Sequence, residues 1–279
     1  MKKSFYYLTA ILLCLAGFLL TACNKKTASS AKPLNALEAI KARGVFILGH
    51  EDSFPPLGFI DGNGESAGYD IDLAKEVAKR MGVDFKTRIV VWEDIKKELD
   101  AGNVDCIWNG FTITAEREND FQMSFPYLAN EQVLVVRNTS SVKSYDDLSG
   151  RVIGYRKATS SRDAIDANPA LKNIVGDIIT YKDNSSAFAD LKVGALDAVV
   201  IDSVAADYYI AQTGEPFAII STPLADEKYV VGFKKGETEL KDEVERILKE
   251  MEKDGTVAEI SKKWFGKDLS IIRCFCLLE

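Results

Sequence analysis

The chain has 279 residues, 47% of them hydrophobic, which is enough apolar material for one large domain or two lobes. Its formal net charge is -7, and loss of the two positive charges of Lys2 and Lys3 would take it to -9. Because binding to phosphates needs a basic face, this acidic balance excludes nucleic acid as an expected partner. It does not exclude small-molecule ligands.

The first 23 residues have the order of a secretory signal. Lys2 and Lys3 precede an apolar run over 5–20, and Leu20-Thr21-Ala22-Cys23 follows. The final residues resemble the lipobox of bacterial lipoproteins, in which the cysteine is acylated and becomes the new N-terminus. We therefore expect a signal peptide over 1–22 and a lipid on Cys23 that holds the protein outside the cytoplasm. An uncleaved membrane helix is the alternative, since about twenty apolar residues can span a bilayer.

The segment after Cys23 has no apolar face to bury. It consists largely of Lys, Thr, Ala and Ser, so residues 23–34 are predicted to be a flexible tether. The folded body is expected to begin near Asn35. No second segment of the body is predicted to span a membrane.

Strand and helix patterns alternate from the start of this body. An apolar run over 45–49 is typical of a buried strand, and Asp61-Gly62-Asn63-Gly64 predicts a hairpin tip. Asp70 is expected to cap a helix that ends at Gly82. Three further elements are predicted next: a strand over 85–91, a helix over 93–101 and a strand over 104–108.

A second set of elements begins near Glu131. The sequence predicts strands over 133–136, 152–155, 178–180, 198–201, 217–220 and 229–233, and helices over 145–148, 161–168, 185–193 and 239–254. This rhythm implies parallel strands with helices on their faces. We expect two α/β lobes with a ligand between them, lobe 1 from 35–128 and 223–268 and lobe 2 from 129–222. Residues 269–279 form an atypical tail.

Cysteine and histidine give no sign of a metal or of a nucleophilic site. Cys106 lies in an apolar strand, where a buried inert thiol is usual, and no disulfide framework or zinc spacing emerges. We therefore predict no metal and no cofactor. His50 is the only histidine, so any Ser/His/Asp or Cys/His arrangement would run through it, and a structural role is its alternative.

The segment from Trp108 to Arg117 runs from a strand end into a helix start. Thr114 can cap that helix, which places Arg117 in the first turn beside free backbone N–H groups that favour an anion. A guanidinium adds two parallel donors that match a carboxylate. From these residues alone, a solvated Arg117 beside an ordinary cap is equally open.

Here the chain resembles a known family, the extracytoplasmic solute-binding proteins of polar amino-acid ABC importers, family 3. The resemblance covers Gly44 to Gly266 and implies a two-lobed periplasmic-binding-protein fold of type II, with two α/β sheets joined by two hinge strands. Its marks are Asp52-Ser53-Phe54-Pro55-Pro56-Leu57-Gly58-Phe59, Gly68-Tyr69-Asp70-Ile71-Asp72-Leu73, Gly110-x-Thr112-x-Thr114-x-x-Arg117, Phe125-Pro126-Tyr127 and Lys262-Lys263-Trp264-Phe265-Gly266.

The resemblance implies how the backbone groups of an amino acid are held. Arg117, helped by Thr112, matches the arginine that clamps the α-carboxylate. Asp202 matches the acid that pairs with the α-ammonium, whose remaining hydrogen bonds would go to the Gly110 carbonyl and the Thr112 hydroxyl. A strand-end acid that caps a turn is the alternative for Asp202. From lobe 2, the resemblance adds two carboxylate donors at the start of a helix, Ser160 and Ser161.

Other positions match the part of the site that faces the ligand side chain. Phe54 and Trp92 would stack on it, although either aromatic could belong to the core. Three polar residues would face it: Glu51, Asn109 and Arg156. Glu51 could instead form a solvated pair with Asp52. If Glu51 and Arg156 both point inward, the site should prefer a polar or zwitterionic side chain, with glutamine, arginine, lysine, histidine and cystine left open.

The expected function is therefore a non-enzymatic, monomeric binding protein that delivers a polar amino acid to the permease subunits of an ABC importer. A cyclohexadienyl or arogenate dehydratase on the same fold is the alternative, with Glu51 as the general acid. A receptor sensor domain is a third possibility. It is disfavoured because no output domain is expected after Gly266. The tail from Ser270 has no place in the family pattern and is expected to be a disordered tail or a reading-frame artefact.

Overall fold

The computed structural model describes residues 34–276 of the chain. Residues 1–33 and 277–279 lie outside this part, so the predicted signal peptide, Cys23 and nearly all of the tether are not described. A compact unit begins at Asn35. Within 34–276, no helix has both the length and the apolar character that crossing a membrane requires.

Lobe 1 is built on three parallel strands. Strand β1 (Val45–His50) lies between β5 (Asp84–Ile89) and β6 (Cys106–Thr112) and pairs in parallel with both. Its helices are α2 (Ala36–Arg43), α3 (Tyr69–Met81), η1 (Trp92–Asp94), α4 (Ile95–Asp100), α5 (Ala115–Asp120), α10 (Thr238–Lys253), α11 (Thr256–Phe265) and α12 (Arg273–Cys276). A small antiparallel sheet of β2 (Ser53–Phe54), β3 (Gly58–Ile60) and β4 (Ser66–Ala67) contains the predicted hairpin.

Lobe 2 repeats this arrangement. Strand β9 (Val152–Arg156) lies between β10 (Asp177–Tyr181) and β11 (Ala198–Asp202), again in parallel. Its helices are η2 (Tyr145–Leu148), α6 (Ser161–Asp166), α7 (Pro169–Ile174), α8 (Asn184–Val193) and α9 (Ser203–Thr213). The parallel strands predicted from the alternating pattern are thus confirmed in both lobes.

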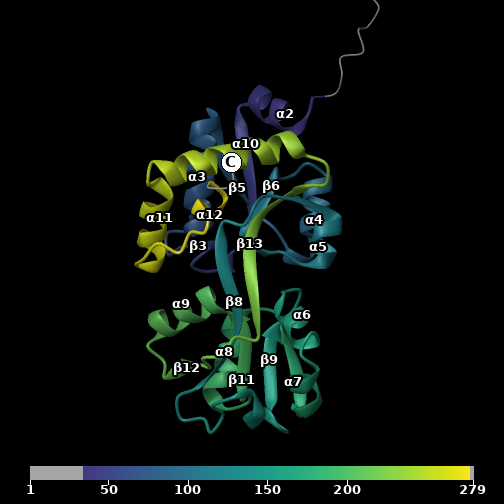
Figure 1. Ribbon diagram of the computed structural model, residues 1–279, viewed down its shortest axis with the longest axis vertical. Coiled ribbons are helices and arrows are strands. Elements are labelled where there is room, and N and C mark those ends of the chain that lie inside the picture. Colours follow the sequence, from purple (N-terminus) through teal and green to yellow (C-terminus); the bar gives the residue numbers. More distant parts are fainter. Residues whose placement is uncertain (1–33, 277–279) are drawn as a thin grey trace, which may run out of the picture. The chain divides into compact units, whose positions relative to one another are not determined.

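Two ten-residue strands connect the lobes. In Figure 1, β8 (Leu128–Arg137) and β13 (Ala225–Lys234) run side by side between them. They pair antiparallel with each other, while β8 also pairs with β11 and β13 with β6. The two predicted sheets are therefore one continuous sheet, which also takes in β7 (Phe121–Met123) and β12 (Phe217–Ile219).

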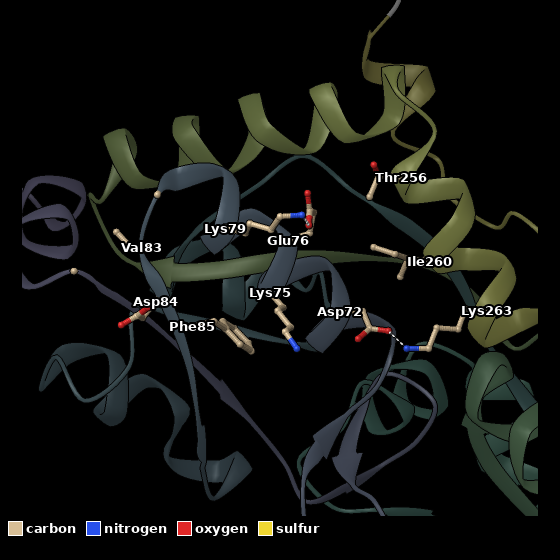
Figure 2. Close-up of a pocket in the computed structure, with 12 residues that line it drawn as sticks. Asp72, Lys75, Glu76, Lys79, Val83, Asp84, Phe85, Thr256, Ile260 and Lys263 are labelled. Atoms are coloured by element: carbon tan, nitrogen blue, oxygen red, sulfur yellow. Dashed lines mark hydrogen bonds and ion pairs between the residues drawn. The ribbon is translucent and has the colours of Figure 1, made fainter.

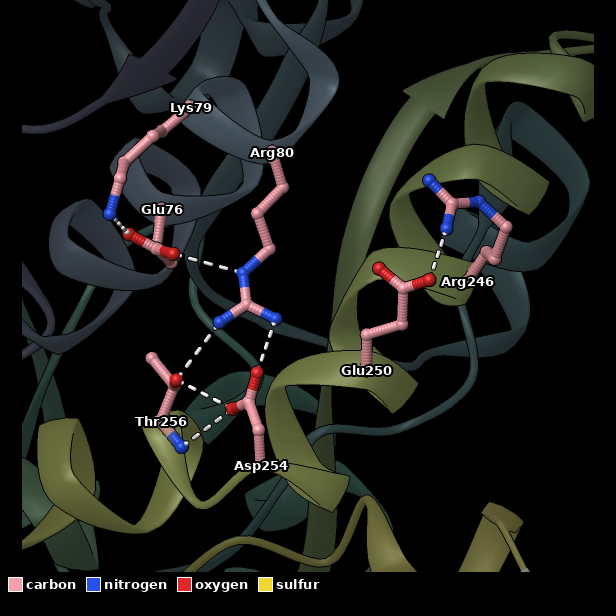
Figure 3. A network of polar contacts seen from close by, with 7 residues as sticks. All are labelled: Glu76, Lys79, Arg80, Arg246, Glu250, Asp254 and Thr256. Atoms are coloured by element: carbon pink, nitrogen blue, oxygen red, sulfur yellow. Dashed lines mark hydrogen bonds and ion pairs between the residues drawn. The ribbon is translucent and has the colours of Figure 1, made fainter.

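Helix α10 packs on lobe 1 through a buried apolar stripe, and polar contacts link its C-terminal end to α3. Its predicted apolar stripe, from Leu240 to Met251, is buried. At its end, Arg80 of α3 donates to Glu76 at 2.9 Å, to Asp254 at 2.7 Å and to Thr256 at 2.9 Å (Figure 3). This network ties α3 to the turn between α10 and α11.

Several elements differ from the sequence prediction. Asp70 is not a cap, because the N-cap of α3 is Gly68, two residues earlier, and the Asp70 side chain is fully buried. Five helices were not predicted: α2, α7, α9, α11 and α12. The tail is packed as far as the structure describes it: Ile272 is fully buried, and the Phe275 ring stacks on Phe125 with centroids 5.3 Å apart. This differs from the expected disordered tail.

Candidate amino-acid site

A small cavity between the lobes gathers most of the predicted site residues. Its volume is about 20 Å3, room for about one or two water molecules. It is lined by Glu51, Phe54, Trp92, Asn109, Gly110, Thr112, Arg117, Arg156, Thr159, Ser160 and Asp202. Ten of the eleven predicted ligand-binding residues are in this set, and only Ser161 is replaced, by Thr159.

Arg117 enters the cavity from the first turn of α5. The predicted cap is confirmed, since the Thr114 hydroxyl accepts from the Arg117 backbone N–H at 3.2 Å. The guanidinium donates to the Thr112 carbonyl at 3.0 Å and lies 4.5 Å above the Phe111 ring, with the Trp92 ring 5.8 Å away. These contacts fix the guanidinium plane.

Arg117 has no carboxylate partner among residues 34–276, although burial works against its charge. Desolvation lowers its pKa, and the more distant carboxylates of Glu227, Asp163 and Asp202 oppose this shift. A buried charge is costly unless it is paired. The remaining donors of Arg117 therefore suit an anion in the cavity.

Asp202, which lines the other wall, and Glu227, which does not line the cavity, form an acidic group. One amide nitrogen, Nδ2 of Asn130, lies 2.7 Å from Asp202 and 2.8 Å from Glu227. The Gln132 amide nitrogen lies 3.1 and 3.0 Å from the same two oxygens, and the Tyr229 hydroxyl donates to Asp202 at 2.6 Å. Burial, followed by the charge of Glu227, raises the pKa of Asp202 to about 7.

Two serine hydroxyls fix the orientation of the Asn130 and Gln132 amides. The Ser203 hydroxyl donates to the Asn130 carbonyl oxygen at 3.2 Å, and the Ser161 hydroxyl donates to that of Gln132 at 2.7 Å. The NH2 groups must then face the acids. Ser161, predicted to reach the ligand, thus lies behind Gln132 instead of lining the cavity.

The sequence prediction missed Glu227, Asn130, Gln132 and Tyr229. The sequence offers only the spacing of two between Asn130 and Gln132, which places them on one face of β8, and the structure shows both to be buried. Strands that begin with polar residues resemble loops, so the predicted strands started only at Val133 and Tyr229.

Glu51 and Arg156 meet across the cavity from the ends of β1 and β9. Arg156 donates through both terminal nitrogens, Nη1 to Glu51 Oε2 at 2.7 Å and Nη2 to Oε1. Each residue is 8% exposed. Burial raises the pKa of Glu51, and Arg156 partly offsets this. Both residues point inward, as the sequence analysis considered, but they neutralise each other.

The other lining residues shape the walls. Asn109 is engaged with the backbone, since its Oδ1 accepts from the Glu51 N–H at 2.7 Å. Gly110 has a φ of +59°, and its N–H donates to buried Asp70 at 2.7 Å. Phe54 and Trp92 are 5% and 7% exposed and form the apolar part.

A hydrogen-bond chain joins the lobes at the cavity. The Ser160 hydroxyl donates to the Thr112 hydroxyl at 3.4 Å, and Thr112 donates to Glu227 at 3.3 Å. Ser160 belongs to lobe 2 and Thr112 to lobe 1. Polar groups of both lobes are therefore available to one ligand.

His50 and Cys106 take no part in the site. Both are fully buried; His50 donates from Nδ1 to the Glu51 carbonyl, and its Nε2 lies 2.8 Å from the Ser66 hydroxyl. Burial lowers the pKa of His50 and raises that of Cys106. The part of the chain that the structure describes contains no group of His, Cys, Asp and Glu that could hold a metal ion.

A much larger pocket of the described residues lies elsewhere. It has a volume of about 830 Å3 and lies on lobe 1 between α3, the start of β5 and α11 (Figure 2). No predicted ligand-binding residue lines it. Its charges partly pair with one another, as in the contact of Lys263 with Asp72 at 2.6 Å.

The geometry of the small cavity suits a dipolar molecule. Arg117 offers donors to an anion, and the acidic group of Asp202 and Glu227 offers acceptors to a cation. Arg117 and Asp202 line the cavity, and Glu227 accepts from Thr112, another lining residue. A family model of bacterial extracellular solute-binding proteins, family 3, matches residues 46–267. The chain belongs to this family.

Proteins that are named for an amino-acid ligand are similar to this chain over most of their length. L-cystine-binding protein TcyJ of Escherichia coli (strain K12) is 31% identical over 84% of this chain and 87% of its own. The ABC transporter glutamine-binding protein GlnH of Bacillus subtilis (strain 168) is 31% identical over 96% and 99%. A solved ABC uptake transporter substrate-binding protein from Streptococcus pneumoniae with bound histidine is 33% identical over 85% and 98%, with a TM-score of 0.81. The names of these relatives describe binding proteins.

Proposed function

We propose that this protein captures a polar L-amino acid outside the cytoplasm and delivers it to the permease of an ABC uptake transporter. One observation carries the proposal: the half-buried Arg117, which has no carboxylate partner within 34–276, and the acidic group around Asp202 border one cavity. An amino acid supplies the missing carboxylate and the missing ammonium together, so both sets of buried charges become paired.

Capture requires the lobes to move. The cavity volume of about 20 Å3 is too small for an amino acid, and Glu51 and Arg156 bridge it. The lobes are joined by β8 and β13. We infer that a hinge in these two strands opens the site, and that ligand contacts to both lobes favour closure.

The names of the relatives support a polar ligand and an ABC transporter. TcyJ and GlnH are named for cystine and glutamine, and GlnH for an ABC transporter. We propose in addition that Cys23 carries lipid. Replacement Cys23→Ser should then release the protein from membranes, and continued acyl labelling of that variant would contradict the anchor.

The direct test is identification of the ligand. We expect mass spectrometry of the purified protein to find a co-purifying amino acid, and calorimetry to show that it binds with one-to-one stoichiometry. Folded protein that binds no L-amino acid in a full panel, after removal of bound material, would refute the proposal. Turnover of prephenate or arogenate would favour the dehydratase alternative.

A further inference from the structure

The ion pair of Glu51 and Arg156 lies toward a different opening of the cavity from Arg117. Two wider hollows adjoin the cavity. Glu51 and Arg156 border the one of about 650 Å3, whereas Arg117 borders the one of about 520 Å3. If Arg117 takes the α-carboxylate, the Glu51 and Arg156 pair is left for the side chain of the ligand.

This pair has no net charge to offer. Arg156 is the cation that acts most strongly on the Glu51 carboxylate, and Asp52 and Glu93 act in the opposite direction. The next cation along the chain, Lys157, pairs with Glu93 at 2.8 Å on the more exposed rim. A ligand side chain with a single charge would therefore enter a buried, already neutral environment.

The pair still has hydrogen-bonding capacity. A guanidinium has five N–H donors and a carboxylate about four acceptor positions, of which the bidentate contact uses two each. A neutral group that accepts from Arg156 and donates to Glu51 can bind without separating them. The phenyl and indole rings of Phe54 and Trp92 supply apolar walls for the stem that leads to this group.

We propose that the bound amino acid has a side chain without net charge that ends in both a donor and an acceptor, either a carboxamide or a second amino-acid end. This specificity rests on the proposed function. A lone cation would have to take Glu51 from Arg156, and a lone anion would have to take Arg156 from Glu51. Each leaves one buried charge without a partner, which is strongly unfavourable.

The first experiment is calorimetry on the full-length protein, stripped of bound material, with L-glutamine, L-cystine, L-lysine, L-arginine and L-glutamate. We expect glutamine or cystine to bind at least tenfold more tightly than the three charged ligands. Comparison of these two shows whether the site prefers a carboxamide or a second amino-acid end. If lysine, arginine or glutamate binds as tightly as the better neutral ligand, the inference about specificity is wrong, while the proposed function is unaffected. Absence of binding by all amino acids would instead refute the proposed function.

The second experiment uses variants that change the charge of the pair. Arg156→Gln leaves Glu51 alone and should shift selectivity at least tenfold toward lysine or arginine, whereas Glu51→Gln should shift it at least tenfold toward glutamate. The double variant Glu51→Gln/Arg156→Gln is neutral again and should keep the preference for neutral ligands, which guards against misfolding of the single variants. Glu93→Gln breaks the rim pair with Lys157 and should change all affinities together. Two single variants that shift selectivity in the same direction would overturn the inference.

Discussion

Asp202 and Glu227 accept hydrogen bonds from the same two amide groups, those of Asn130 and Gln132. The sheet causes this arrangement, because β8 lies between β11 and β13 and places Gln132 opposite Asp202 and Asn130 opposite Glu227. Two carboxylates are thereby held together without a Lys or Arg partner within the described residues. A proton or a ligand ammonium can relieve their repulsion.

Ligand affinity should consequently depend on pH. The pKa of Asp202 is raised to about 7, so in the free protein the acid takes up a proton as the pH falls through that value. A proton competes with the ammonium, and we expect affinity to be constant above about pH 8 and to fall by up to about tenfold per pH unit below about pH 6. Calorimetry from pH 5 to 9 measures this directly.

Glu227→Gln provides the matched control. It removes the neighbouring charge that helps to raise the pKa of Asp202, while a side-chain oxygen remains to accept from Asn130. The fall in affinity should therefore move to lower pH. An unchanged pH profile in this variant would show that Glu227 does not act on the ammonium site.

Of the two acids in this group, Asp202 was predicted from the sequence and Glu227 was not. Asp202 was identified because it ends an apolar strand and matches a family position. Glu227 and Asn130 lie in the polar starts of two long strands, where alternation of exposed and buried residues has no apolar signal. Only the pairing of the strands, a long-range property, brings these side chains together.

Arg117 should be essential for binding. Arg117→Ala removes the guanidinium held against Phe111 and Trp92, and we expect no measurable affinity. Arg117→Lys keeps the charge but loses the planar pair of donors, worth about 3 kcal/mol, so affinity should fall about 100-fold. Calorimetry with Arg246→Lys, an exposed residue on α10 (Figure 3), as a control tests this. An Arg117→Lys variant with wild-type affinity would contradict the carboxylate assignment.

Arg117 also illustrates what the sequence could predict. The cap residue Thr114 fixes the first turn of α5, but this local rule left a solvated Arg117 equally open, and only the resemblance to family 3 assigned Arg117 to the ligand. The partner of Arg156 was not predictable in the same way, because Glu51 lies 105 residues away in the other lobe. Local signals located each side chain, whereas the contact between lobes depended on the closed arrangement.

Gly110 should tolerate no side chain. A Cβ atom at this position would lie 2.6 Å from Phe54 and 2.7 Å from Leu57, and the φ of +59° already strains any other residue. Gly214 has nearly the same φ, +61°, with nothing within 4 Å. In urea unfolding, Gly214→Ala should cost about 1 kcal/mol and Gly110→Ala about 2–4 kcal/mol, with affinity reduced at least tenfold. Equal costs would show that the wall at Phe54 yields easily.

The C-terminal segment should contribute to stability. Ile272 is fully buried against lobe 1, so Ile272→Ala should lower the free energy of unfolding by about 2–5 kcal/mol. Val193→Ala, at a position that is 77% exposed, should change it by less than about 0.5 kcal/mol. If the two variants unfold at the same denaturant concentration, the packed tail is not part of the folded protein in solution.

Asp70 should make the protein less stable as the pH rises. Its carboxyl is fully buried and accepts from the Gly110 N–H at 2.7 Å, and burial outweighs this bond and the nearby donors of Tyr127 and Trp108 and raises its pKa to about 7. A folded-state pKa above the unfolded value of 3.8 means that the folded protein binds the proton more tightly. Stability is therefore lost between about pH 4 and 7, by an upper estimate of about 4 kcal/mol.

Asp70→Asn isolates this effect, because an amide oxygen can still accept from Gly110 and the side chain no longer ionises. We expect the variant to be more stable than the wild type at pH 8, with a difference that disappears by about pH 4. Thermal unfolding across this pH range, with the exposed Asp84→Asn as a control, measures it. A difference between Asp70→Asn and wild type that stays constant with pH would contradict a raised pKa of Asp70 in the folded protein.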